Sequence, residues 1–150
     1  MDRRTNLIKL KSAGLTALVF TVFLVGFWPT PVSAKEIAWQ SFADGMSRGK
    51  SENKKIFLHF YANWCGACRI MENKTFKDAA VIAYINENFI PIKVNADREQ
   101  KTSQMFRVRA LPDNWFIDED GKPIGHRLGY ISPKQLKGIL KKLMNENTGQ

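Results

Sequence analysis

The chain has few of the side chains that form cross-links and metal centres, because its 150 residues include only two cysteines and two histidines. A framework of several disulfides is therefore excluded, and a closed zinc site, which needs four ligands, lacks a suitably spaced set of donors. Internal repeats, low-complexity linkers and nucleic-acid-binding motifs are also missing. The net charge of +9 is therefore interpreted as a source of solubility and electrostatic steering, and no nucleic-acid partner is predicted.

Charged residues are absent from positions 13–28, an apolar stretch of 16 residues. Four basic side chains precede this stretch, and Val32-Ser33-Ala34 follows it after two prolines. This order predicts a secretory signal peptide over residues 1–34, cleaved after Ala34, and one domain over residues 35–150 in the periplasm or outside the cell. The alternative is an uncleaved membrane anchor, although the apolar stretch is shorter than the roughly 20 residues that span a bilayer.

Both cysteines lie in one short motif, Cys65-Gly66-Ala67-Cys68, which follows Trp64 and an apolar run over residues 56–61. The pattern predicts a strand that delivers two thiols to the first turn of a helix. Sulfur atoms one helical turn apart can form and release a disulfide with little backbone movement. We therefore interpret the motif as a redox-active dithiol.

The position of Cys65 at the predicted helix N-terminus identifies it as the nucleophile, because unpaired N–H groups and the helix dipole favour a thiolate over a thiol. Arg69 adds a positive charge, and Trp64 is expected to limit solvent access from one side. Cys68, one turn deeper, is predicted to be the shielded resolving thiol. No metal or organic cofactor is expected, since the dithiol itself carries the electrons.

Two other interpretations compete with the redox one. A purely structural disulfide is disfavoured, because so short a loop removes little chain entropy from the unfolded state. A copper- or zinc-handling protein could use the two thiolates as ligands. His59 and His126 are the remaining soft donors, and neither has a ligand-like spacing to the cysteines.

Hydrophobic periodicity and capping residues predict alternating helices and strands over the rest of the chain. Asp78 is predicted to cap a helix, Ser132-Pro133 to begin the last one, and the Asp-Gly step at 120–121 to turn an antiparallel hairpin. The fold class is therefore α/β, with a mixed central sheet and helices on both faces. Helices are expected at 41–53, 66–74, 78–88, 98–106 and from 132 onward, and strands at 55–61, 89–94, 115–118 and 124–129.

The strand, the Trp64–Cys68 run and the later Leu111-Pro112 resemble the thioredoxin superfamily over roughly residues 37–143. Within that superfamily, the similarity is greatest to the secreted thioredoxin-like disulfide reductases and closest to the C-terminal domain of the membrane disulfide reductase DsbD. The segments that carry this finer resemblance are residues 60–65, 71–76 and 94–97.

The resemblance implies the thioredoxin fold, with a cis peptide bond between Leu111 and Pro112 placed across from the dithiol. The backbone of Leu111 would then pair with an extended stretch of substrate, and Trp64, Gly66 and Ala67 would complete the substrate-binding set. It also implies reduction of disulfide-bearing protein substrates, with recharging by a membrane thiol-electron donor. A dithiol oxidase of the same fold is the alternative, and a monomer is expected.

Three positions bear on how this chain differs from the thioredoxins. His59 stands six residues before Cys65, where many thioredoxins carry an aspartate that assists proton transfer, and Glu72 matches an acid of the reductase subgroup. We expect His59 or Glu72 to take the proton of Cys68; alternatively, His59 only packs in the core and Glu72 is a solvated helix residue. Asp113 replaces a usual threonine, and its charge is expected to affect partner choice or thiol potential.

Overall fold

The computed structural model describes residues 36–145, so the predicted signal peptide and its cleavage site lie outside the described residues. These residues form a four-stranded sheet of order β2-β1-β3-β4. The two strands β1 and β2 are parallel, whereas β3 is antiparallel to both β1 and β4. The strands are β1 (Lys55–Tyr61), β2 (Phe89–Asn95), β3 (Asp113–Ile117) and β4 (Pro123–Leu128).

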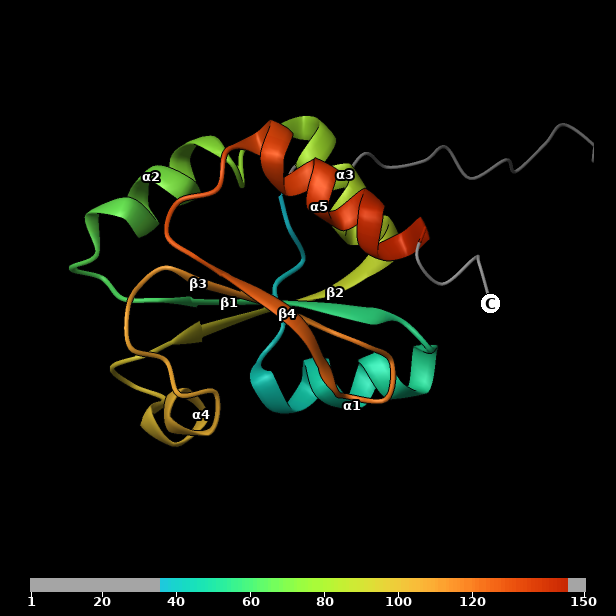
Figure 1. Ribbon diagram of the computed structural model, residues 1–150, viewed down its shortest axis with the longest axis horizontal. Coiled ribbons are helices and arrows are strands. Elements are labelled where there is room, and N and C mark those ends of the chain that lie inside the picture. The colour runs from blue at the N-terminus through green and yellow to red at the C-terminus, as the bar shows by residue number, and fades with distance from the viewer. Residues whose placement is uncertain (1–35, 146–150) are drawn as a thin grey trace, which may run out of the picture. The chain divides into compact units, whose positions relative to one another are not determined.

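Helices cover both faces of this sheet, which confirms the predicted architecture (Figure 1). Three helices lie on one face: α2 (Gly66–Lys74), α3 (Ala79–Asn88) and α5 (Pro133–Asn145). The other face carries α1 (Phe42–Glu52) and the short α4 (Gln100–Met105). None of the helices within residues 36–145 is long and apolar enough to cross a membrane.

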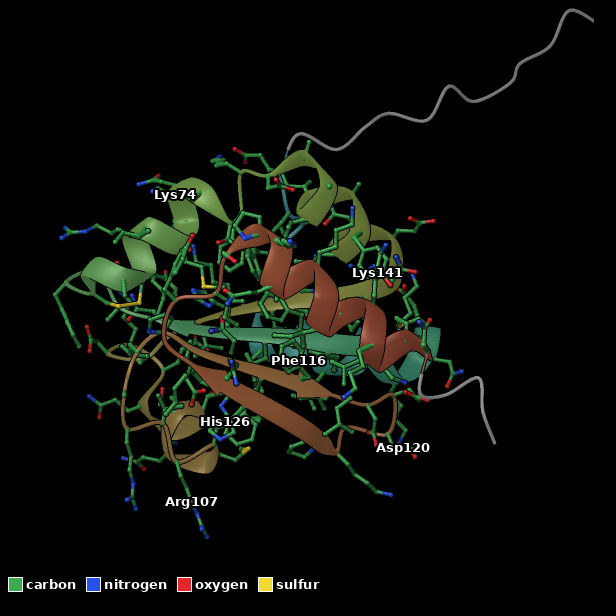
Figure 2. The ribbon with its side chains drawn as sticks, turned by 45° about the horizontal axis from the view of Figure 1, so that its top comes forward. Lys74, Arg107, Phe116, Asp120, His126 and Lys141 are labelled. Carbon is green, nitrogen blue, oxygen red and sulfur yellow. A yellow bond between two sulfur atoms is a disulfide. The ribbon has the colours of Figure 1, made fainter. Side chains whose placement is uncertain are left out.

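The alternation of side chains along β1 divides the core into two layers. Phe57 faces α2, α3 and α5, where it packs with Phe116 of β3 at a ring separation of 5.7 Å. Leu58 and Phe60 face α1 and α4, in a cluster with apolar residues of β2. Figure 2 shows Phe116 in the interior beside α5. Because β1 lies between β2 and β3 and helices cover both faces of the sheet, even Lys55 and His59 of this strand are buried.

Local capping explains where several helices begin. The Ser41 hydroxyl accepts the N–H of Asp44 at 3.2 Å, and the Asp78 carboxylate accepts two N–H groups at the start of α3. The predicted turn between β3 and β4 is also present, with Gly121 at a φ of +85° that favours glycine. These elements were predicted correctly because their signals lie within a few residues of one another.

The predicted start of β3 is wrong by two residues. The strand begins at Asp113, immediately after Pro112, and Asp113 and Asn114 pair with Phe60 and His59 of β1. Both residues have low intrinsic strand preference, so the pairing with the buried central strand overrides local propensity. The other element boundaries agree with the predictions to within about two residues, the usual scatter of element ends.

Candidate functional site

The two cysteines lie at the start of α2, just after the end of β1. Cys65 is the N-cap of α2, and its Sγ accepts the backbone N–H of Cys68 at 3.1 Å. A disulfide joins the two residues, whose Cα atoms are 5.3 Å apart. Both are buried, Cys68 more deeply than Cys65. The sulfur of Cys65 thus occupies the helix N-terminus, where N–H groups stabilise negative charge.

The Leu111–Pro112 segment lies against this disulfide, and its peptide bond is cis, as expected. Leu111 packs, as Ala67 does, against the small buried cluster of Ala62 and the two cysteines. The carbonyl of Pro112 accepts the N–H of Gly129 at 2.7 Å, which ties this segment to the end of β4. The fold therefore brings residues 65–68 and 111–112 together, although more than 40 residues separate them in the chain.

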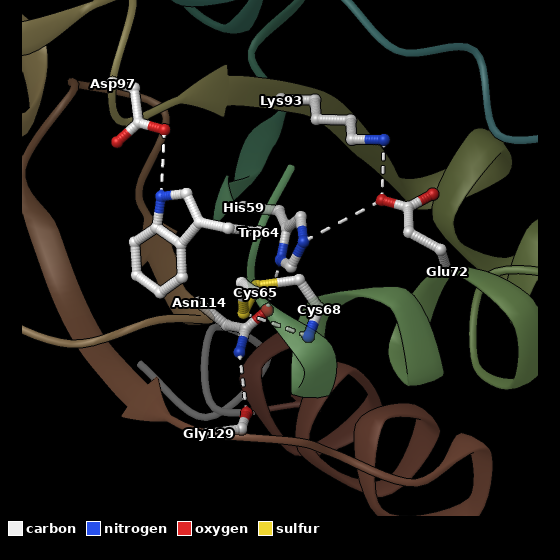
Figure 3. The surroundings of a disulfide bond; sticks show 9 residues. All are labelled: His59, Trp64, Cys65, Cys68, Glu72, Lys93, Asp97, Asn114 and Gly129. Atoms are coloured by element: carbon white, nitrogen blue, oxygen red, sulfur yellow. Dashed lines mark hydrogen bonds and ion pairs between the residues drawn. A yellow bond between two sulfur atoms is a disulfide. The ribbon is translucent and has the colours of Figure 1, made fainter. Parts of the chain in front are cut away.

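Trp64 forms the exposed margin of the site, with 68% of its surface accessible. Its Nε1–H donates to a carboxylate oxygen of Asp97 at 3.0 Å, so the indole is held in one orientation beside Cys65 (Figure 3). Gly66 is also exposed, and a Cβ added to it would contact nothing. This arrangement leaves an apolar ring and open backbone next to the disulfide.

His59 lies beneath the site in the middle of β1 and is fully buried. It is in register with Lys93 of β2 on one side and Asn114 of β3 on the other. Its Nδ1 is hydrogen-bonded to Asn114 Oδ1 at 2.8 Å, whereas its Nε2 has no hydrogen-bond partner. The rings of Phe76 and Tyr61 contact the imidazole at centroid separations of 4.9 and 6.2 Å.

Burial lowers the pKa of His59 to about 4 from an ordinary value of 6.5. The hydrogen bond with Asn114 opposes this shift, and the positive charge of Lys93 adds to it. The imidazole is therefore neutral near pH 7, which confirms the expectation that burial favours the uncharged form.

Glu72 lies one helical turn after Cys68 on α2 and faces the same interior region. One of its carboxylate oxygens, Oε1, is 2.6 Å from Lys93 Nζ and 4.0 Å from His59 Nε2 (Figure 3). The carboxylate is therefore ion-paired with a partly buried lysine and remains partly exposed to solvent. His59 and Glu72, predicted as alternatives, face each other beside Cys68.

Asp113 is the first residue of β3, and its side chain lies away from the disulfide, against Trp115 and His126. Its carboxylate is buried, accepts Trp115 Nε1–H at 2.9 Å and bonds His126 Nδ1 at 3.0 Å. His126 stacks on Trp115, which belongs to the core layer opposite His59. The carboxylate after Pro112 thus has its hydrogen-bond partners within β3 and β4, on the far face of the sheet. Within residues 36–145, no three His, Cys, Asp or Glu side chains form a metal-binding group.

Lys93 and Asn114 also belong to the site, although no sequence motif indicated them. Both are polar residues in strands that are otherwise apolar, and both flank His59 in the sheet. A polar residue in a buried strand needs a partner, so this pattern was a usable signal. Which residues would meet depended on strand order and register.

Comparison with known proteins gives one family and several relatives. A model of the thioredoxin-like domain family matches residues 42–144. A thioredoxin of Mycoplasmoides gallisepticum is 35% identical over 91 residues, which cover 61% of this chain and 86% of that protein. The thiol:disulfide interchange protein DsbD of Actinobacillus pleuropneumoniae is 32% identical over 98 residues, or 62% of this chain and 17% of that protein. The thiol-disulfide oxidoreductase ResA of Bacillus anthracis is 28% identical over a segment that covers 61% of this chain and 65% of that protein.

Solved structures share the architecture at lower identity. An oxidoreductase named DsbH superposes with a TM-score of 0.63 and 18% identity, over 81% of this chain and 91% of that one. A thioredoxin from Thermus thermophilus superposes with a TM-score of 0.66 and 17% identity, over 73% and 88% of the two chains. At such identities the likeness concerns the fold alone.

Proposed function

Because the chain belongs to the thioredoxin-like domain family of thiol-disulfide oxidoreductases, we propose that it reduces protein disulfides in the cell envelope. The observation that carries this proposal is the position of Cys65 Sγ at the N-cap of α2, beside the Leu111–Pro112 segment. One sulfur thus lies where backbone N–H groups stabilise a thiolate, next to backbone that can pair with an extended substrate.

In the reducing direction, the Cys65 thiolate attacks one sulfur of a substrate disulfide. A mixed disulfide forms, and the other substrate sulfur leaves as a thiolate that takes up a proton. Cys68 then loses its proton and attacks Cys65 Sγ, which forms the Cys65–Cys68 disulfide and releases the second substrate thiol. The substrate gains two electrons and the dithiol loses two, so no further cofactor is needed.

Two side chains are the proposed acceptors for the proton of Cys68. His59 is neutral near pH 7 and has an unpaired Nε2, and Glu72 lies one turn along the same helix. Glu72 is also partly exposed, so a proton that reaches its carboxylate can pass to solvent. In this proposal, His59 and Glu72 form one route for the proton.

Trp64, Gly66, Ala67, Leu111 and Pro112 form the proposed substrate-binding surface. The exposed indole supplies apolar contact area, and Gly66 leaves room for a substrate chain above the start of α2. The carboxylate of Asp97 keeps the indole from moving freely, which lowers the entropy cost of binding a partner.

We place this chemistry in the envelope because the N-terminal sequence has the order of a secretory signal peptide, with cleavage after Ala34. A reductase in an oxidising compartment must be recharged, and a membrane thiol-electron donor is the proposed source. Intact-mass measurement of the protein from envelope fractions tests this location. A first residue at Lys35 supports cleavage, whereas the full chain in the membrane fraction replaces cleavage by anchoring.

The direction of electron flow is tested by the reduction potential of the dithiol. The protein is equilibrated with glutathione redox buffers, and the oxidised fraction is followed by tryptophan fluorescence, to which the indole next to Cys65 contributes. A potential near that of thioredoxin, about −270 mV, supports a reductase, whereas one near about −120 mV supports an oxidase. Stoichiometric copper or zinc in the reduced protein, with no disulfide exchange, would instead support metal handling.

A further inference from the structure

The orientation of the Asn114 side-chain amide is determined by its surroundings. Its Nδ2 group donates to two backbone carbonyls, those of Arg127 at 3.1 Å and Gly129 at 3.3 Å. Carbonyl oxygens only accept hydrogen bonds, so the amide nitrogen must point toward them. The amide oxygen is therefore the atom that faces His59, at 2.8 Å from Nδ1.

This orientation decides which ring nitrogen of His59 carries the proton. An amide oxygen only accepts, so the short contact requires His59 Nδ1 to be the donor. A neutral imidazole has one N–H, and burial keeps this imidazole neutral near pH 7. The Nε2 atom consequently bears a lone pair, and it is buried without a hydrogen-bond partner.

The groups around the Nε2 lone pair determine where a proton bound there can go next. Glu72 Oε1 of α2 lies 4.0 Å away, with Lys93 of β2 paired to the same oxygen at 2.6 Å. The ring of Tyr61 stacks on the imidazole, and Figure 3 shows the imidazole lying behind the disulfide, on the side toward Glu72. A proton that arrives at Nε2 therefore meets a carboxylate that is itself partly exposed to solvent.

We propose that Asn114 is a positioning residue that holds His59 in the Nδ1–H tautomer, so that Nε2 accepts the proton of Cys68 when this thiol resolves the mixed disulfide. This inference rests on the proposed exchange chemistry. The Cys68 S–H bond breaks as an N–H bond forms at Nε2, and the thiolate then displaces the substrate sulfur from Cys65. The imidazolium returns its proton through Glu72 to solvent or to the departing thiolate. Because the pKa of His59 is low, the proton stays only briefly on the ring.

The tautomer is measured directly in the full protein by long-range ¹⁵N–¹H correlation spectra of its two histidines, assigned with His126→Gln. We expect a pyrrole-type nitrogen at Nδ1 and a pyridine-type nitrogen at Nε2 of His59. In Asn114→Leu the acceptor for Nδ1 is lost, and we expect the proton to move to Nε2, where it can donate to Glu72. A pyrrole-type Nε2 in the unmodified protein would overturn the proposal without any variant.

The kinetic test uses Ellman's reagent with the reduced protein in a stopped-flow instrument. Attack by Cys65 releases one thionitrobenzoate, and resolution by Cys68 releases the second, so the two steps appear as separate phases. We expect Asn114→Leu to slow the second phase about tenfold and the first phase less than twofold. A tenfold effect is smaller than the effect of losing general-base catalysis completely, because the imidazole itself remains.

Asn86→Leu is the matched control, because the Asn86 side chain on α3 also bonds two backbone groups, those of Ala38 and Glu36, and neither belongs to the site. A second phase in Asn114→Leu that equals that of Asn86→Leu would overturn the positioning role. Failure of the unmodified protein to release any thionitrobenzoate would instead refute the exchange activity, and the tautomer measurement would still stand.

Discussion

The Lys93 ammonium lies 2.6 Å from Glu72 Oε1, and this same oxygen faces the unpaired Nε2 of His59 at 4.0 Å. The three charged or titratable side chains come from β2, α2 and β1, so no segment of the chain contains the group. The ammonium also lies 4.4 Å from the centre of the Tyr61 ring, a cation–π contact. The charge of Lys93 therefore acts on both candidate proton carriers at once.

Replacing Lys93 with methionine should raise the pKa of His59 above its value of about 4, because the positive charge of Lys93 contributes to the lowering. The measurement is an NMR titration of the His59 ring protons. Lys141→Met, on the exposed surface of α5, is the matched control and should leave this pKa unchanged. A His59 pKa that stays the same or falls in Lys93→Met would contradict the proposed electrostatic coupling.

The free energy of unfolding should depend on pH through His59. Its folded-state pKa of about 4 lies below the ordinary 6.5, so the stabilisation is complete above pH 6.5 and is lost as pH falls toward 4. The loss should be about 3 kcal/mol, measured by urea unfolding of the oxidised protein. His59→Gln should lack this component while His126→Gln retains it. Equal pH dependence in the unmodified protein and in His59→Gln would contradict the assignment.

The roles of the two cysteines predict opposite trapping behaviour. Cys68→Ser leaves Cys65 able to attack, with no thiol to resolve, so mixed disulfides with partner proteins should accumulate in cells. Cys65→Ser should trap none and should lose exchange. Non-reducing electrophoresis followed by mass spectrometry detects the trapped partners. Adducts that appear with Cys65→Ser and not with Cys68→Ser would reverse the two roles.

Trp64→Ala should raise the KM for a protein disulfide such as insulin by about tenfold, since an exposed aromatic ring that a bound partner covers contributes about 1–2 kcal/mol. The rate with a small disulfide such as Ellman's reagent should change less than twofold. Met105→Ala is the matched control, because Met105 has 69% of its surface exposed against 68% for Trp64 and lies at the end of α4. Equal effects of the two variants on KM would remove Trp64 from the binding surface.

Gly45→Ala should destabilise the protein by about 1–3 kcal/mol, because a Cβ at this position would overlap the Ile92 side chain of β2. The glycine allows α1 to lie close against the sheet that carries His59 and Lys93. Gly138→Ala on α5 is the control: its Cβ meets no atom, and it should stabilise by about 0.5–1 kcal/mol. Thermal unfolding of both variants measures the difference, and a Gly45→Ala variant as stable as the parent would refute this close packing.

Much of the fold was predictable because its signals are local. The N-caps at Ser41 and Asp78 and the turn at Gly121 depend on residues within one or two turns of each other. Apolar periodicity marked the core strands and the inward face of α3. The start of β3 was mispredicted, because Asp113 and Asn114 carry no strand signal of their own and are held by pairing with β1.

The sequence alone determined the chemistry of the dithiol. The spacing of Cys65 and Cys68 and the strand before them place two sulfurs at the start of a helix, and this arrangement depends only on backbone geometry over a few residues. The Leu111-Pro112 step was likewise recognisable from the sequence alone, through its resemblance to the thioredoxin superfamily.

Only the tertiary structure decided what surrounds that dithiol. His59 meets Asn114 and Glu72 because three strands adopt one register and α2 crosses above them. Register is set by the burial of whole strand faces, so a shift of one residue would turn Asn114 away from His59. The contacts that orient His59, the proposed proton acceptor, therefore arise from cooperative packing across the sheet, which no single segment of the chain specifies.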